Sequence, residues 1–264
     1  MLNKTNYTAN ISYLTNIFIY EYDISKANIN VLHSKGVIDK NTYYYLYNSE
    51  RMARQKYVGM LCKDKTINNI LKQGILEAKQ MLFSTNDICD NDILSIKNDA
   101  VFVINKKLIN TTFGLINFIM KNIYTSFYKL ENLEVYYYYN NITREENIDI
   151  KGISDDKLKY HEGYFLEILK DILYSIQVNG PEITLEMIKD IYNEYISFGF
   201  KKEFYRSFDI ESDYIYNFKS NLGTGFSCSG LNECDKTMLN IMRNVSILLQ
   251  LNRIVTDMYF NKYR

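Results

Sequence analysis

The sequence predicts an α+β fold, in which an antiparallel sheet is combined with helical regions. Three observations predict it: an alternating run rich in Ile and aromatics at residues 17–24, two short β-rich runs on either side of residue 98, and long segments with apolar residues at helical spacing. Strands and helices are grouped along the chain instead of alternating as βαβ units, and this grouping favours α+β over α/β.

The elements follow in a definite order. The strand at 17–24 leads into a short helix that Gly36 closes, and residues 39–84 are helix-like in two or three pieces, the last starting near Thr66. The runs 93–96 and 100–104 form a predicted β-hairpin with Asp99 at its tip. The remaining expected elements are strands at 115–121, 123–130, 133–139 and 147–153, helices at 157–178 and 183–198, and a closing helix at 231–260.

Composition narrows the class of protein. The 264 residues carry 31 basic and 31 acidic side chains and are 47% hydrophobic, which argues against disorder and against a globally basic nucleic-acid coat. No apolar run approaches the roughly 18–20 residues of a membrane span, and no secretory signal opens the chain. The cysteines form no CxxC pair, so we expect reduced thiols in a cytoplasmic protein that binds neither zinc nor membrane (Cys62, Cys89, Cys228 and Cys234).

The abundance of Tyr, Asn, Ile and Lys indicates an origin. These residues have AT-rich codons, whereas Pro occurs once and Trp is absent. We therefore expect a low-GC genome, such as that of a virus or phage, and location in the host cytoplasm.

Two acidic residues stand out by position. Asp23 lies where the first strand becomes a helix, and Asp99 lies at the hairpin tip. If these elements are neighbours in one sheet, the two carboxylates meet at its edge and can hold two Mg²⁺ ions about 4 Å apart, as phosphoryl and nucleotidyl transfer requires. Acids also commonly cap helices and turns, so either Asp alone is weak evidence.

Residues 17–155 resemble the palm and fingers of family B DNA polymerases. The family's first motif, an Asp followed by a pattern such as SLYPSII, is similar to DISKANINVL at 23–32, and its DTDS hairpin is similar to KNDA at 97–100. Its fingers motif KxxxNSxYG has the spacing of RMARQKYVG at 51–59, and its K-G-[IV] element is similar to DIKGI at 149–153. Departures from the family are Lys97 for the first Asp of DTD and Asn28 for a nucleotide-stacking Tyr. The fingers motif has Arg51 for Lys and Gln55 for Asn, and the lysines that usually precede the K-G-[IV] element are missing from the tyrosines at 136–139.

The resemblance implies a palm-like antiparallel sheet with a helical fingers insertion and a helical, thumb-like C-terminal region. The implied parts are the first part of the palm (1–38), the fingers (39–86), the second part of the palm (87–154) and the thumb-like region (155–264). It also implies a template-dependent nucleotidyltransferase that uses Mg²⁺, with Mn²⁺ as an alternative, and whose partners are a primed template, nucleoside triphosphates and a further polymerase subunit or replication protein.

Candidate site residues follow from these motifs. Asp23 and Asp99 are the catalytic candidates, and the carbonyl of Ile24 joins them as a metal ligand. The nucleotide-binding candidates are Asn28, Arg51, Arg54, Gln55, Lys56 and Gly59, and the nucleic-acid-binding candidates are Lys151 and Gly152. Helical spacing puts Arg51 and Arg54 on one face and turns Lys56 away from it. Further lysines extend the positive character of the helical region (Lys63, Lys65, Lys72 and Lys79).

Two other functions fit the same residues. Lys97 favours a catalytically inactive palm-like subunit that binds nucleic acid or a replication or transcription partner, because a cation there replaces part of the metal charge. Paired Asp residues also serve metal-dependent nucleases, although no Asp-x-Glu pair follows the first strand. The tyrosines at 136–139 are expected to alternate between the two faces of a strand, one in the core and one able to stack on bases. Core packing or codon bias is favoured over stacking, because such rings dominate ordinary cores.

Overall fold

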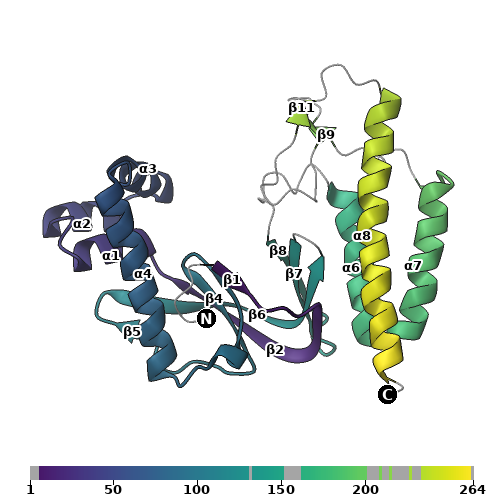
Figure 1. The fold of residues 1–264 in the computed structure, drawn as a ribbon, viewed down its shortest axis with the longest axis horizontal. Coiled ribbons are helices and arrows are strands. Elements are labelled where there is room, and N and C mark those ends of the chain that lie inside the picture. The colour runs from purple at the N-terminus through teal and green to yellow at the C-terminus, as the bar shows by residue number, and fades with distance from the viewer. Residues whose placement is uncertain are drawn as a thin grey trace. The chain divides into compact units, whose positions relative to one another are not determined.

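The computed structural model describes residues 6–130, 133–151, 162–200 and 233–262, together with the pairs 208–209, 214–215 and 226–227. Its contacts divide the chain into two compact units (Figure 1). The first comprises Met1–Asn10 and Ile17–Ile123, and the second comprises Ile11–Asn16 and Tyr124–Arg264. The chain therefore passes between the units after Asn10, after Asn16 and after Ile123.

The elements confirm the predicted α+β class. The strands are β1 (Asn6–Thr8), β2 (Tyr13–Ile24), β3 (Ile93–Lys97), β4 (Ala100–Ile104), β5 (Thr112–Phe113), β6 (Ile116–Leu130), β7 (Leu133–Tyr139), β8 (Glu146–Lys151), β9 (Phe208–Asp209), β10 (Tyr214–Ile215) and β11 (Phe226–Ser227). The helices are α1 (Ala27–Ser34), α2 (Lys40–Asn48), α3 (Arg51–Leu61), α4 (Lys65–Thr85), the 3-10 turn η1 (Asp90–Asp92), α6 (Glu162–Val178), α7 (Pro181–Ile196) and α8 (Glu233–Lys262).

In the first unit the sheet order is β1-β3-β4-β2-β6, and the pairings with a resolved register are antiparallel. The hairpin β3–β4 forms as predicted, with a two-residue turn at Asn98 and Asp99. Asn98 adopts a left-handed backbone (φ 47°), which Asn tolerates better than most residues and which a tight turn requires. The register places Asp23 of β2 opposite Ala100, directly beside this turn.

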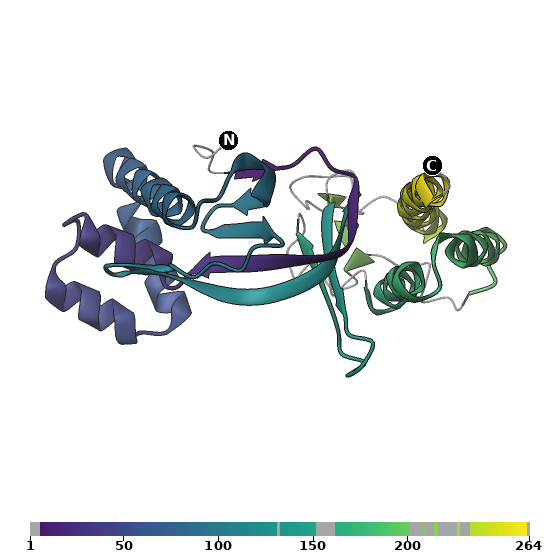
Figure 2. The ribbon, with the colours of Figure 1, turned by 90° about the horizontal axis from the view of Figure 1, so that it is seen from below.

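Helices α2 and α4 begin at capping residues that the sequence shows. Asp39 caps α2 by accepting a hydrogen bond from the Thr42 amide (2.8 Å), and Asp64 caps α4 by accepting one from the Thr66 amide (2.7 Å). β2 ends beside the helices that follow it in the chain (Figure 2).

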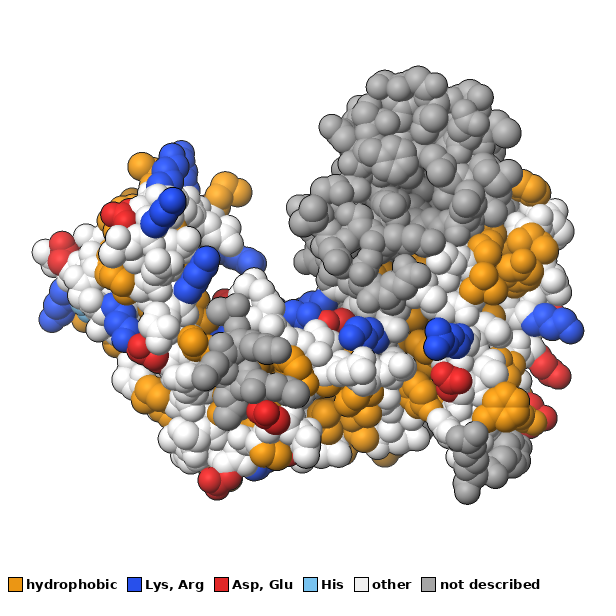
Figure 3. All heavy atoms as spheres, viewed as in Figure 1, with side chains coloured by type: hydrophobic (Ala, Val, Ile, Leu, Met, Phe, Trp, Pro, Cys, Tyr) orange, Lys and Arg blue, Asp and Glu red, His pale blue; other side chains and the backbone are white. Residues whose placement is uncertain are grey.

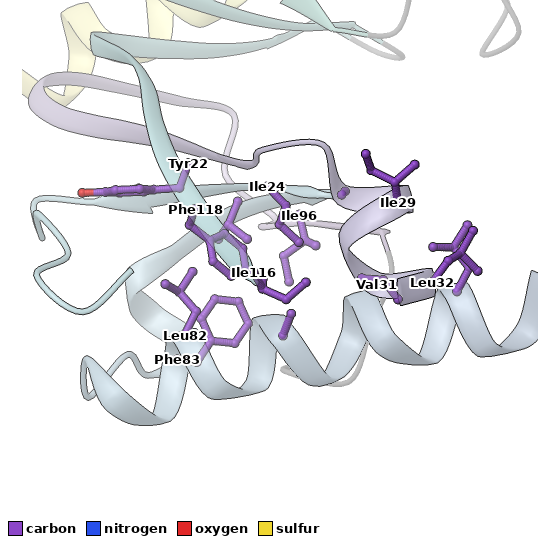
Figure 4. Close-up of a cluster of buried hydrophobic side chains, with 14 of the residues drawn as sticks. Tyr22, Ile24, Ile29, Val31, Leu32, Leu82, Phe83, Ile96, Ile116 and Phe118 are labelled. Atoms are coloured by element: carbon purple, nitrogen blue, oxygen red, sulfur yellow. The ribbon is translucent and has the colours of Figure 1, made fainter. Parts of the chain in front are cut away.

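The core of the first unit lies between the sheet and helices α1 and α4. Ile24, Ile29, Leu82, Phe83 and Phe118 are among the buried side chains that meet there (Figure 4). Burying such side chains stabilises the fold by about 1.5–3 kcal/mol each relative to leaving them exposed. This packing fixes the sheet against α4.

Gly74 lies where α4 packs closely against α1. A methyl group at this position would come well inside van der Waals contact of Val31 Cγ1, a short branched side chain that is itself buried. On α3, a methyl group at Gly59 would meet nothing within 4 Å.

We therefore expect Gly74→Ala to lower the free energy of unfolding by about 1–3 kcal/mol through overpacking. Gly59→Ala serves as the matched helical control and should raise it by about 0.5–1 kcal/mol, because Ala is the better helix former. Urea unfolding followed by circular dichroism measures both. Equal stability of the two variants would contradict the close approach of α1 to α4.

The second unit contains the end of β6, strands β7 and β8, and helices α6, α7 and α8. β6 pairs with β7 and β7 with β8, both antiparallel, and the amide of Lys129 donates to the carbonyl of Ser12 (2.9 Å). Neighbouring Tyr136 and Tyr137 lie on opposite faces of β7, and both are fully buried. The expectation that core packing is favoured over base stacking for this tyrosine run is therefore confirmed at these two positions.

Two expectations about individual elements are also corrected. The segments 115–121 and 123–130 form one strand, β6, because the polar pair at 121–122 does not interrupt it: Asn122 Nδ2 donates to the carboxylate of buried Glu21 (2.6 Å). Lys79, predicted to extend a positive surface, is fully buried. None of the described helices combines the length and apolarity that crossing a bilayer requires.

Candidate active site

Two carboxylates meet where β2 ends. Asp23 is the penultimate residue of β2, and Asp99 occupies the turn between β3 and β4. The amide of Ile24 donates a hydrogen bond to the carbonyl of Asp99 (3.3 Å), so the backbones of the two segments are tied together at this point. The predicted meeting of a strand end and a hairpin tip is thus confirmed.

A pocket of about 340 Å³ opens over these carboxylates. Its walls come from the end of β2, the start of α1, the turn at Asp99, one face of α3 and β6. The lining residues are Asp23, Ile24, Lys26, Ala27, Asn28, Ile29, Arg51, Arg54, Gln55, Val58, Asp99 and Lys121. The pocket therefore collects all three predicted metal ligands and most of the predicted nucleotide-binding residues.

Asp23 is in an electrostatically costly position. Its Oδ1 atom is buried and has no hydrogen-bond partner within the described part of the chain. Burial raises the pKa of Asp23 above its ordinary value of 3.8, the negative charge of Asp99 raises it further, and Lys121 lowers it. An ionised carboxylate in such surroundings is stabilised when a cation binds beside it.

The donor set fits Mg²⁺. Mg²⁺ is commonly held by one or two carboxylates and completes its shell with water and substrate phosphate oxygens. Asp23 and Asp99 supply such a pair, and the Ile24 carbonyl would add a third oxygen. Within the described residues no group of three or more His, Cys, Asp or Glu is arranged to hold a metal.

Cations surround the acidic pair. Lys26, Arg51, Arg54 and Lys121 line the same pocket as Asp23 and Asp99, so basic groups outnumber acidic ones. In the space-filling view, Lys and Arg side chains gather over the part of the first unit that α3 forms (Figure 3). A pocket with four basic and two acidic side chains suits an anionic ligand that binds together with a divalent metal.

The four cations differ in what holds them. Arg54 Nη1 donates to the carbonyl of Ser49, so it braces the connection between α2 and α3. Lys26 Nζ donates to the carbonyl of Tyr47 (2.8 Å) and lies 3.2 Å from the centre of the Tyr47 ring, which ties the start of α1 to the end of α2. Arg51 and Lys121 are exposed, so their side chains are available to a ligand.

Other predicted residues lie away from this pocket wall. Lys56 and Gly59 are exposed on α3 but do not line the pocket, because Arg51, Arg54, Gln55 and Val58 form the facing stripe. Lys97 also lies outside the pocket wall, and its Nζ donates to Thr8 Oγ1 of β1 (3.0 Å).

The predicted nucleic-acid-binding pair lies elsewhere in the chain. Lys151 ends β8 in the second unit and forms an ion pair with Asp149 (2.6 Å), and Gly152 lies outside the described residues. Lys26 and Lys121 line the pocket but were not among the predicted site residues. Lys121 is an exposed residue on a strand, and only the neighbouring position of β2 and β6 reveals that it faces Asp23.

Fold and site together define an α+β protein with a carboxylate pair beneath a cationic helix face. The chain matches the family described as "Bacteriophage PBS1 gene 130 protein" over residues 1–257 and belongs to that family. This membership confirms the predicted phage origin. No curated protein matches the chain.

Proposed function

We propose that this phage protein is a template-dependent nucleotidyltransferase related to DNA polymerases, and that Asp23 and Asp99 hold its Mg²⁺ ions. One observation carries the proposal: a single pocket brings together the Asp from the strand end, the Asp from the hairpin turn and the Arg51–Gln55 face of the helix between them in sequence. The resemblance to family B palm and fingers motifs places similar segments in the same order, with Lys97 and Asn28 as departures, and it implies a role for the residues that match.

The chain's own residues would act on a nucleoside triphosphate as follows. Asp23 and Asp99 would present carboxylate oxygens to the metal, and Mg²⁺ when bound would neutralise phosphate charge and stabilise the attacking and leaving oxygens. Arg51 and Lys121, both exposed, would contact the phosphates. Arg54 would keep α3 in place through Ser49, and Gln55 would supply an uncharged hydrogen-bonding group.

Primer extension tests this proposal. The full chain is incubated with a primed DNA template, the four deoxynucleoside triphosphates and Mg²⁺, with parallel reactions containing EDTA, Mn²⁺ or unprimed template. We expect extension that needs both primer and divalent metal. Absence of extension under every metal condition, from folded protein that binds primed template, would overturn the catalytic proposal.

That last outcome would favour the inactive-subunit alternative. Its supporting observation is Lys97, which stands where related palms carry an acid and which is engaged with Thr8. Such a subunit would bind primed template equally well with and without divalent metal.

Arg51→Met should raise the apparent KM for nucleotide about tenfold, because it removes a charged contact to phosphate worth about one factor of ten in affinity. Lys56→Met is the matched control, since Lys56 is exposed on the same helix but outside the pocket wall. Steady-state kinetics with varied nucleotide measure both. A larger effect at Lys56 than at Arg51 would contradict the assignment of the pocket-facing stripe.

A further inference from the structure

One lysine on α4 lies inside the protein beneath the turn that carries Asp99. Lys79 is 0% exposed, and its Nζ donates a hydrogen bond to the carbonyl of Asn98 (2.8 Å). Fully buried lysines are rare because desolvating an ammonium group is costly. A residue kept at such a cost needs a reason, and its contact with the turn supplies one.

The turn is fastened on several sides. The Asn98 amide donates to Asn6 Oδ1 (3.1 Å), its carbonyl accepts from Lys79, and the carbonyl of Asp99 accepts from the amide of Ile24 (3.3 Å). Elements distant in sequence thus converge on two residues. Because Asn98 has a left-handed backbone, a small shift here would re-aim the neighbouring carboxylate of Asp99.

Charge supports the same contact. Burial lowers the pKa of Lys79 to about 8, and the negative charge of Asp99 opposes that fall. A charged donor forms a stronger hydrogen bond than a neutral one. Lys79 does not line the pocket, so it would act on a ligand only through the turn.

We propose that Lys79 is a positioning residue, which holds the Asn98–Asp99 turn so that the Asp99 carboxylate faces the metal beside Asp23. The inference rests on the proposed function for its metal, while the hold on the turn can be tested without it. A methionine of similar length would fill the same space without the desolvation cost of a charge. The hydrogen bond from the ammonium to the Asn98 carbonyl is a contact that methionine could not make.

The test compares Lys79→Met with Lys72→Met, a control on the same helix whose side chain is exposed. Two quantities are measured on the full chain: amide hydrogen exchange at Ile24 and Asn98, which are bonded at the turn, and Mn²⁺ binding by calorimetry. We expect Lys79→Met to accelerate exchange at these two amides, with the amide of Leu82 in the core unchanged. We also expect its Mn²⁺ binding to be about tenfold weaker.

Whether Lys79→Met weakens or tightens Mn²⁺ binding distinguishes a positioning role from the electrostatic repulsion between Lys79 and the metal. Removing an ammonium near a metal site by itself tightens cation binding, since like charges repel. Weaker binding therefore indicates a displaced carboxylate. Unchanged exchange at Ile24 and Asn98, or unchanged or tighter Mn²⁺ binding by a folded Lys79→Met protein, would overturn the proposal.

Two further outcomes are decisive. If Lys79→Met does not fold, Lys79→Gln replaces it, because Gln retains an N–H donor. Faster exchange at Ile24 and Asn98 in this variant than in wild type supports positioning. Exchange as in wild type at full Mn²⁺ affinity overturns the role of the charge. If the wild type binds no Mn²⁺, the proposed metal site fails, while hydrogen exchange still decides whether Lys79 holds the turn.

Discussion

Asp99→Asn and Asp23→Asn should each reduce metal-dependent nucleotide incorporation by about a thousandfold or more, because each removes a ligand charge from a two-metal site. Both substitutions keep the size of the side chain, and Asn at 99 still suits a turn. Primer extension under single-turnover conditions measures the loss. The effect is expected on the chemical step and not on binding of the primed template.

Asp87→Asn is the matched control for this loss. Asp87 is exposed and has a left-handed backbone (φ 51°), a conformation that Asn accepts readily. It should extend primers as the wild type does. Activity retained in the double variant of Asp23 and Asp99 would rule out the proposed metal site.

Asp23→Asn should at the same time stabilise the metal-free protein near neutral pH. The folded pKa of Asp23 lies above its ordinary value of 3.8, so its contribution to stability is fully present below that value and is lost as pH rises through the folded pKa. At pH values above the folded pKa, the wild type keeps a buried negative charge at Asp23, which the Asn side chain of the variant lacks. We expect the melting temperature of the variant to be higher by about 2–4 °C at pH 7.

With divalent metal, the wild type should be more stable than Asp23→Asn. Mn²⁺ at about 100 times its Kd stabilises the wild type by about 2.7 kcal/mol, whereas Asp23→Asn should respond little. Thermal unfolding at pH 4 and pH 7, with and without Mn²⁺, gives all the comparisons. A variant that is less stable than wild type at pH 7 without metal would show that Asp23 serves the fold and not a ligand.

Local signals in the sequence predicted much of the fold. The β3–β4 hairpin, the three helical pieces between Asp39 and Thr85 and the strand ending at Asp23 depend on alternation, capping residues and turn residues that lie close together in the chain. The break expected within β6 was wrong because a polar pair usually ends a strand, whereas here Asn122 bonds to buried Glu21. Tertiary contact overrode the local pattern.

The candidate site was predictable only in part. Asp23, Asp99, Arg51 and Arg54 could be proposed from a strand end, a hairpin tip and helical spacing, and Gln55 from the resemblance to the fingers motif. Lys121 and Lys79 could not, since one depends on the order of strands in the sheet and the other on how α4 packs beneath a turn. The sequence alone does not distinguish Lys121, exposed on a strand, from Lys79, buried on a helix.

The chain passes between its two units more than once, so neither unit is encoded by one continuous segment. Residues 11–16 belong with the unit that resumes at Tyr124, so the pocket-bearing part is not a contiguous stretch of the gene. A fragment ending at Ile123 would carry this segment without its companion and would leave the Ser12 carbonyl without the Lys129 amide. Neither unit can therefore be exchanged between phage genomes by a single recombination joint, and the two should be inherited together.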